Sequence, residues 1–392
     1  MGSLPFPGAA ERLICAVLRQ EAATWNGNDD AAAIALFLDA GRYHGVLPLL
    51  DAAFRRRTNA GTWPREILSA CVKAARDQAM FELAHRVEIV RVLAALASAG
   101  VAPLVLKGAA LACSHYPSAP LRPRADTDLL IPPDRRRETD LALTRLGYAK
   151  DAGVEGRFIS HQATWSRSDN LGATHHLDIH WRINNSPILA KALDYEELVA
   201  RAAPLPALGP NARALAPVHA LLFACLHRTG HANAPYYVDG IAHLGGDRLI
   251  WLYDMHLLVG RMSAAELDDF AALAIAKQIK AICAEALLRA RACFATPIPS
   301  HVIAMLHEPG PLEPSARYLS GGRARQMVGD FLALERWSDR GGWVKELAFP
   351  SAGYMRSKYS DAAGTWLPIL YARRALTGMA RLIHARGADH RH

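Results

Sequence analysis

Apolar residues recur along this chain with two different periods, and the change between them divides it into regions. In the first hundred residues the spacing is helical, as in "PREILSACVKAARDQAMFELAHRVEIVRVLAALASAG", which begins at Pro64 and ends at Gly100. From Val101 short apolar runs bounded by glycine and proline follow, and these are typical of strands. Helical spacing returns from Asp194 onward.

The middle of the chain predicts a small mixed sheet. "VAPLVLKG" reads as a short strand that stops at a glycine, and "ADTDLLIPP" as a second strand stopped by two prolines. "DRRRETDLALTRLGYA" predicts a helix with Asp134 as N-cap and Gly147 as C-cap. "RFISHQATWSR" and "THHLDIHWRI" alternate as paired strands do. We therefore predict an α+β fold with three regions: N-terminal helical, 1–98; α/β core, 99–200; C-terminal helical, 201–392.

Composition and charge limit the class of protein. Of the 392 residues 51% are apolar and 21% charged, so the whole chain can be globular. The net charge of +8 suits anionic partners such as nucleotides, although an arginine-rich composition can also reflect genomic base bias. The six cysteines form no C-x-x-C pair, which argues against a zinc ribbon or a disulfide framework. Because the start lacks a secretory pattern and no apolar run approaches ~20 residues, we expect a cytoplasmic protein with no membrane partner.

Two aspartates at the start of an apolar strand are the strongest chemical signal. Asp126 and Asp128 are two residues apart, so on a strand they project from the same face. Two ionised carboxylates that close repel each other unless a cation lies between them. D-x-D also occurs at solvated strand ends. Here, however, Lys107-Gly108 and a short predicted helix come just before it, an order that suits a metal and a phosphate group.

Taken together, these motifs resemble a known family. "LVLKGAAL", "LRPRADTDLLI", "LTRLGY" and "LDIHWRI" look like the uncharacterised bacterial nucleotidyltransferases of the DNA polymerase β-like superfamily. "RYHGVLPLL", "HALLFACLHRTGH" and "FPSAGYMRSKY" extend the resemblance over most of the chain. The resemblance implies a polymerase-β-like nucleotidyltransferase core, a small mixed sheet with helices, flanked by helical regions on both sides.

The resemblance also implies roles for single residues. Members of the superfamily carry a glycine motif, then a D-x-D pair, then a third acidic residue on a later strand. By position, Gly108 matches the motif glycine. Asp126 and Asp128 match the metal-binding pair, and Asp178 matches the third carboxylate. The chain departs from the pattern at Ala109, where glycine or serine is usual, and in a longer gap between the glycine and the aspartate pair.

The implied reaction is in-line nucleotidyl transfer dependent on Mg²⁺ or Mn²⁺, with the three aspartates as catalytic and metal-binding residues and Asp178 as a base. The residues expected to contact the nucleotide are Lys107, Gly108, Ala109, Arg124 and His180. We prefer Arg124 to Arg122 because its parity along the chain matches that of Asp126. His180 shares the strand face of Asp178 and is expected either to shuttle a proton or to orient its neighbours.

The expected substrates follow from the resemblance alone. It implies transfer of a nucleoside monophosphate from a nucleoside triphosphate, or of a related group such as a sugar from a nucleoside-diphosphate sugar. Such proteins are often encoded among genes for ribosomally made peptide natural products, so a peptide acceptor such as a phosphorylated lasso peptide is expected rather than nucleic acid. Two alternatives stay open. Transfer to RNA ends predicts a long basic groove, and non-catalytic nucleotide binding is favoured by Ala109 but opposed by the intact aspartates.

Three further features carry weaker signals. His227 and His231 form H-x-x-x-H, which suits zinc, but no nearby glutamate completes a metalloprotease pattern, so packing or a pocket wall is favoured. Asp254 lies within an apolar helical pattern and is expected either to contact the nucleotide or to pair with an arginine. Basic and aromatic residues after Phe349 suit single-stranded nucleic acid, but their helical spacing favours a helical wrap that packs on the core.

Overall fold

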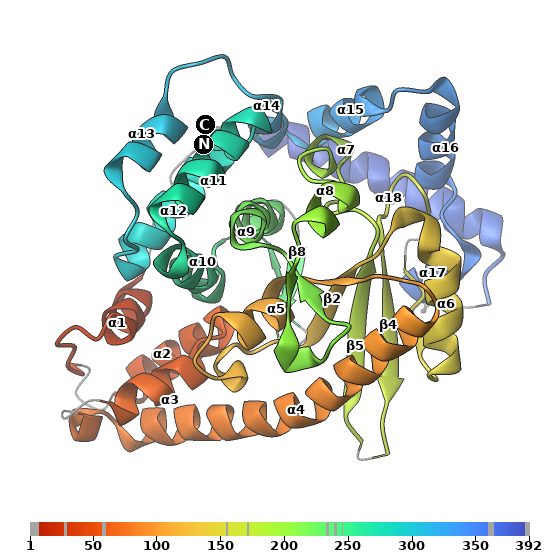
Figure 1. Ribbon diagram of the computed structural model, residues 1–392. Coiled ribbons are helices and arrows are strands. Elements are labelled where there is room, and N and C mark those ends of the chain that lie inside the picture. Colours follow the sequence, from red (N-terminus) through yellow and green to blue (C-terminus); the bar gives the residue numbers. More distant parts are fainter. Residues whose placement is uncertain are drawn as a thin grey trace.

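The fold is known from a computed structural model in which a mixed sheet lies between helices (Figure 1). All statements below refer to the residues that it describes: 8–26, 30–56, 60–153, 156–170, 172–232, 235–238, 241–244, 246–359 and 364–388. The strands and the helices alternate and mix along the chain, which confirms the predicted α+β class.

The N-terminal region is helical, as the spacing of its apolar residues predicts. The helices are α1 (Ala9–Leu18), α2 (Ala31–His44), α3 (Leu47–Arg55) and α4 (Arg65–Ser98). Helix α4 has 34 residues, so it is about 51 Å long. It begins directly after Pro64 and ends just before Gly100, whose φ of +73° suits a residue without a side chain. In Figure 1 it runs beneath the sheet from one side of the molecule to the other.

Seven short strands form the main sheet in the order β3-β4-β5-β2-β1-β7-β6. The strands are β1 (Leu104–Val105), β2 (Asp126–Leu130), β3 (Ala149–Lys150), β4 (Gln162–Ser168), β5 (Thr174–His180), β6 (Ala203–Pro204) and β7 (Arg213–Ala214). β2 pairs with β5 in parallel and with β1 antiparallel, and β4 pairs with β5 antiparallel. Two helices connect these strands, α5 (Lys107–Ser114) and α6 (Arg136–Arg145).

The two faces of the sheet have different partners. Leu129, Leu177 and Ile179 belong to a core that they share with residues of α4 and α6. Leu104 and Leu130 point to the other face and join a larger core built by the N-terminal and C-terminal helices. Side chains alternate along a strand, so Asp126 and Asp128 lie on the same face as Leu130. The acidic residues therefore face the helical regions rather than α4.

The sheet continues beyond residue 200, where only helices were expected. β7 pairs in parallel with β1, and β6 pairs with β7, so the sheet takes in residues up to Ala214. A separate hairpin, β8 (Pro235–Val238) and β9 (Ile241–Leu244), also lies in the region predicted to be helical. The boundary at residue 200 stays a prediction for the domain, but the sheet extends beyond it to Ala214.

The C-terminal region supplies helices on two sides of the sheet. They are α7 (Pro187–Ala190), α8 (Tyr195–Ala200), α9 (Pro217–Ala232), α10 (Leu249–Arg261), α11 (Ala264–Ala276), α12 (Lys280–Phe294), α13 (Ser300–His307), α14 (Pro314–Ser320), α15 (Arg323–Ala333), α16 (Trp337–Ala348), α17 (Ala352–Lys358) and α18 (Leu367–Ala388). Met355, Tyr359 and Leu370 form a small core between α17 and α18, as expected for a helical wrap. None of the helices in the described residues combines the length and the apolar character that a membrane crossing requires.

Candidate metal and nucleotide site

The pairing of β2 with β5 brings the predicted acidic residues together. In this parallel pair Asp128 stands opposite Asp178, and Leu130 stands opposite His180. Side chains at opposed positions of neighbouring strands point to the same face of a sheet. The D-x-D strand and the "LDIH" strand, about fifty residues apart in sequence, therefore present their polar side chains side by side.

Three of these side chains form a group that could hold a metal ion. One ligand atom from each of Asp128, Asp178 and His180 lies within 4.8 Å of the other two, and no other such group occurs among the described residues. Asp126, on the same strand face, lies outside this group of three. Its charge nevertheless acts on the group, because the pKa of Asp126 responds to both Asp128 and Asp178.

Neighbouring groups hold the three ligands in place. The Lys107 ammonium donates a hydrogen bond of 2.6 Å to Asp128 Oδ1. His180 Nε2 lies 2.9 Å from the same oxygen and, because that carboxylate is ionised, donates its proton to it. The Thr164 hydroxyl, on β4, donates to Asp178 Oδ1 over 2.7 Å. Each carboxylate thus keeps its second oxygen for another partner.

The electrostatics of the site fit a divalent cation. Burial alone would raise the pKa of Asp128, but Lys107 and the hydrogen bond from His180 outweigh it and hold that pKa below its usual range. Burial and the two neighbouring carboxylates raise the pKa of Asp126 to about 7. Burial and mutual repulsion thus oppose ionisation of all three carboxylates at once, and a bound cation would relieve that repulsion. An oxygen-rich set of this kind is what Mg²⁺ or Mn²⁺ prefers.

Lys107 joins β1 to α5 in an unusual backbone conformation. Its φ is +48°, a left-handed value that costs a non-glycine residue about 1–3 kcal/mol and is frequent at functional sites. At Gly108 a Cβ would lie 3.3 Å from the Arg122 guanidinium, so the glycine allows that group to approach. The amides of a helix N-terminus and an ammonium side by side suit a phosphate.

Two arginines that were candidates for phosphate binding have acidic partners. Arg122 makes a buried bidentate pair with Asp254 at 2.8 Å, and Tyr116 donates a hydrogen bond to the same carboxylate. Asp254 thus pairs with an arginine, one of its two predicted roles. Arg124 pairs with Glu82 of α4 at 2.7 Å. It precedes the first residue of β2, so strand parity does not apply to it, and the reason for preferring it to Arg122 was wrong.

An apolar pocket adjoins Lys107 on the side away from the carboxylates. It is a narrow cavity of about 40 Å³ between α5, α9 and α10. Lys107, Arg122 and Asp254 form its polar edge, and the rings of His227 and Trp251 line its wall. These two rings meet edge to face with centroids 5.4 Å apart. His227 and His231 are therefore part of a ring cluster, as the packing interpretation of H-x-x-x-H predicts, rather than of the metal group.

Two functional positions were missed by the sequence interpretation. Thr164 orients Asp178, but its role depends on the register of β4 against β5, and nothing in a single strand pattern specifies that register. Trp251 lines the pocket from α10, and its helical spacing is that of an ordinary core residue. The signal that could have marked Trp251 is its position three residues before the buried Asp254.

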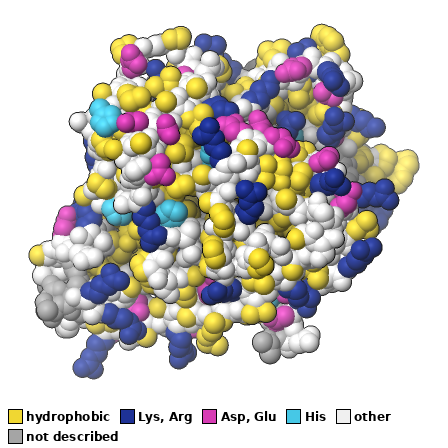
Figure 2. Space-filling model, viewed as in Figure 1, with side chains coloured by type: hydrophobic (Ala, Val, Ile, Leu, Met, Phe, Trp, Pro, Cys, Tyr) yellow, Lys and Arg dark blue, Asp and Glu magenta, His cyan; other side chains and the backbone are white. Residues whose placement is uncertain are grey.

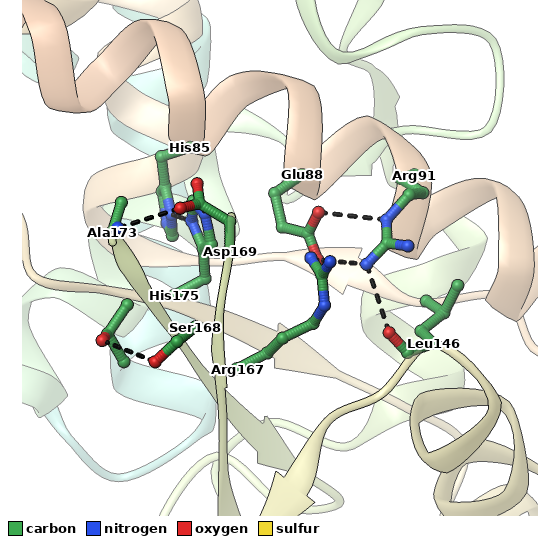
Figure 3. A network of polar contacts seen from close by, with 10 residues as sticks. His85, Glu88, Arg91, Leu146, Arg167, Ser168, Asp169, Ala173 and His175 are labelled. Carbon is green, nitrogen blue, oxygen red and sulfur yellow. Dashed lines mark hydrogen bonds and ion pairs between the residues drawn. The ribbon is translucent and has the colours of Figure 1, made fainter. Parts of the chain in front are cut away.

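A chain of histidines links α4 to the sheet, and Figure 3 shows its members His85 and His175 together with Asp169. His175 Nε2 donates to Asp169 over 3.1 Å, so its Nδ1 must accept from His85 Nδ1–H, 3.0 Å away. His85 Nε2 is then an acceptor, and it takes the hydroxyl proton of Thr127 over 2.7 Å. Burial, above all, lowers the pKa of His85 to about 3, which keeps it neutral as this chain requires. Thr127 lies between the two aspartates, so the chain ties their strand to α4.

The comparison with protein families agrees with this geometry. The sequence pattern of a family described as uncharacterised nucleotidyltransferase matches residues 30–295, about two thirds of the chain. The matched range contains the acidic group, Lys107 and the apolar pocket, and it ends after α12. None of the curated proteins compared with this chain matches it. With a match of this extent, the chain belongs to the uncharacterised nucleotidyltransferase family.

Proposed function

We propose that this protein transfers a nucleoside monophosphate from a nucleoside triphosphate to an acceptor, with a divalent cation bound at Asp128 and Asp178. The observation that carries the proposal is the group of Asp128, Asp178 and His180 beside the N-terminus of α5. Membership of the nucleotidyltransferase family supports nucleotidyl transfer as the class of reaction, and the charge and the donors of the site suit this reaction.

The protein's own residues have distinct tasks in this proposal. The triphosphate lies at the N-terminus of α5, where the backbone amides and the Lys107 ammonium offset its charge. The left-handed backbone of Lys107 turns the chain between β1 and α5, next to the proposed position of the phosphates. The base packs at the mouth of the narrow apolar pocket, whose wall contains Trp251 and His227. The Arg122–Asp254 pair at the pocket edge is rigid and offers polar contacts to the ribose.

The carboxylates and His180 manage charge and protons. A bound Mg²⁺ or Mn²⁺ would neutralise negative charge on the phosphates and on the attacking oxygen. Asp178, held by Thr164 through one oxygen, keeps the other available toward the acceptor hydroxyl. His180 donates to Asp128 and fixes the orientation of that carboxylate.

Two features weigh against transfer to RNA ends. That reaction needs a long basic groove, whereas Figure 2 shows the described Lys and Arg side chains scattered over the viewed face, with several along the lower edge where α3 and α4 lie. The two arginines nearest to the acidic group are paired with Asp254 and Glu82. A nucleoside-diphosphate sugar as donor and a peptide as acceptor stay predictions of the sequence resemblance. Non-catalytic nucleotide binding is separated from catalysis by the experiment below.

Binding of Mn²⁺, followed by electron paramagnetic resonance, tests the site directly. We expect the wild-type protein to bind Mn²⁺ and to form labelled product from radioactive nucleoside triphosphates. Asp128→Asn should lose both properties while its circular dichroism spectrum stays that of the wild type. Asp140→Asn, on exposed α6, is the matched control and should retain both. Unchanged Mn²⁺ affinity in Asp128→Asn would refute the metal site, and Mn²⁺ binding without any transfer would favour the non-catalytic alternative.

A further inference from the structure

A second, open groove begins where β5 ends. Its volume is about 610 Å³. One side consists of the loop 184–186 after β5 and of Phe158 and Ile159 before β4. The other side consists of residues from α14, α15 and α16. The residues of this second side lie beyond the range 30–295 that matches the family, so the groove is built jointly by the family region and by the part of the chain that follows it.

The chain connects this groove directly to the acidic group. His180 is four residues before Asn184, a span of at most about 13 Å in extended chain. On the neighbouring strand, Gln162 stands opposite His180 and is three residues after Ile159. Helix α9 makes a third connection, because its Gly230 lines the groove. A Cβ added at Gly230 would lie 3.6 Å from Asn184 Nδ2. Only short stretches of chain therefore separate the groove from the acidic group.

The lining of the groove is polar but lacks positive charge. The Ser186 hydroxyl donates to one oxygen of Asp330 over 2.7 Å, and the Tyr318 hydroxyl donates to the other over 3.1 Å. Side-chain amides add further donors and acceptors, and Trp343 supplies a flat apolar surface. Among the described residues that line the groove there is no lysine or arginine. One carboxylate without a cation repels a phosphorylated or nucleic-acid ligand, whereas hydroxyl groups can both donate to it and accept from the amides.

Two contacts hold the α16 side of the groove in place. The Glu346 carboxylate accepts hydrogen bonds from the backbone N–H groups of Arg157, Phe158 and Ile159, at 2.7, 2.8 and 3.1 Å. The Phe158 ring lies against Gly342 so closely that a Cβ there would overlap it. These contacts join the loop before β4 to α16 and so fix two sides of the groove relative to each other.

We propose that this groove binds the acceptor, and that the acceptor is an uncharged molecule with several hydroxyl groups next to an aromatic or apolar part. The proposal rests on the nucleotidyl transfer proposed above. In the transfer, an acceptor hydroxyl oxygen forms a bond to the α-phosphorus of the nucleoside triphosphate. The bond from that phosphorus to pyrophosphate breaks, pyrophosphate leaves with the bonding electrons, and the hydroxyl proton passes to a site carboxylate and then to water.

A pair of probes that differ in charge tests the chemical class. Phenyl β-D-glucoside is neutral, and phenyl β-D-glucuronide is the same ring system with a carboxylate. We measure the binding of each to the full chain by ligand-observed NMR and isothermal titration. The glucoside should bind at least tenfold more tightly than the glucuronide. Asp330→Asn should weaken glucoside binding about tenfold or more, since a hydrogen bond to a charged acceptor is lost. Asp339→Asn, on α16 but outside the groove lining, should leave it unchanged.

A second variant guards against a folding defect, and a competition tests the rival acceptors. Gln326→Trp fills the groove from α15 and should abolish glucoside binding with the melting temperature preserved. Equal binding of the two probes, no binding of either, or unchanged binding in Asp330→Asn would overturn the proposal. So would displacement of the glucoside by a phosphopeptide or a 5′-phosphorylated RNA. Mn²⁺ binding should be normal in both groove variants, so a failure of the groove is distinguishable from a failure of the metal site.

Discussion

The ion pair between Arg124 and Glu82 indicates that Arg124 stabilises the fold rather than binding the phosphates of the nucleotide. Their charged ends lie 2.7 Å apart, and their side chains are only 3% and 5% exposed. The pair joins the segment before β2 to α4. In this position Arg124 has a structural task, since its guanidinium would have to leave a buried carboxylate behind in order to reach a nucleotide.

Breaking the pair from either side should cost about the same. Removing one partner of a buried ion pair leaves an unpaired charge in the interior and typically costs about 3–5 kcal/mol. We therefore expect Arg124→Met and Glu82→Gln each to lower the free energy of unfolding by roughly that amount. Replacing both partners, as in Arg124→Met with Glu82→Leu, leaves no charge behind and should recover most of the loss. The coupling energy in this double-mutant cycle should exceed about 2 kcal/mol.

Urea titrations of the four proteins give the unfolding free energies, and calorimetric titration with a non-hydrolysable nucleoside triphosphate gives the nucleotide affinity. If Arg124 is structural, the two single variants lose stability in parallel, and their folded fractions bind nucleotide as the wild type does. The reasoning fails if Arg124→Met weakens nucleotide binding tenfold while Glu82→Gln does not. It fails equally if either single variant is as stable as the wild type.

Three further predictions concern the packing around the site. Thr127→Val removes the hydroxyl that donates to His85 and should cost about 1–3 kcal/mol in urea unfolding, with Thr127→Ser closer to the wild type. His85 and His161 have pKa values lowered, mainly by burial, to about 3 and 4, so unfolding at acid pH lets them take up protons. Stability should fall as the pH drops below about 6.5, by about 2 kcal/mol for each histidine at pH 5, and urea midpoints unchanged between pH 7 and 5 would contradict this. Gly342→Ala should cost about 1–3 kcal/mol because a Cβ meets Phe158. In the same helix Gly341→Ala, where nothing lies within 4 Å, should be stabilising by up to about 1 kcal/mol, and scanning fluorimetry separates the two.

Local patterns were sufficient for the elements that carry the site. The start of α4 after Pro64 follows from proline geometry, and the end of α6 before Gly147 follows from a residue that accepts a φ of +84°. Asp134 was wrongly predicted as the N-cap of α6. It is the middle residue of a short 3₁₀ turn, Pro133–Arg135, that precedes the helix, and Arg135 occupies the N-cap position instead.

Where the sequence interpretation failed, the outcome depended on pairing between distant segments. β6 and β7 have two residues each, too few for any alternation to appear, and they exist because β1 offers an edge to pair with. The position of Arg124 depends on where β2 begins, and Glu82, forty-two residues earlier, holds it. Such contacts are properties of the tertiary structure, and no local pattern encodes them.

The same reasoning explains why the acceptor groove could not be seen in the sequence. Helical spacing after residue 295 shows that those helices pack, but not that α15 and α16 pack beside the end of β5. Asp330 looks like an ordinary surface acid until Ser186 and Tyr318 are found hydrogen-bonded to it. The residues for metal and nucleotide all lie within the family match, whereas one whole side of the groove lies outside it. Under the two proposals above, donor chemistry and acceptor choice are therefore carried by different parts of the chain. A change confined to α14–α16 should therefore alter which acceptor is used and leave the affinity for Mn²⁺ and nucleotide intact.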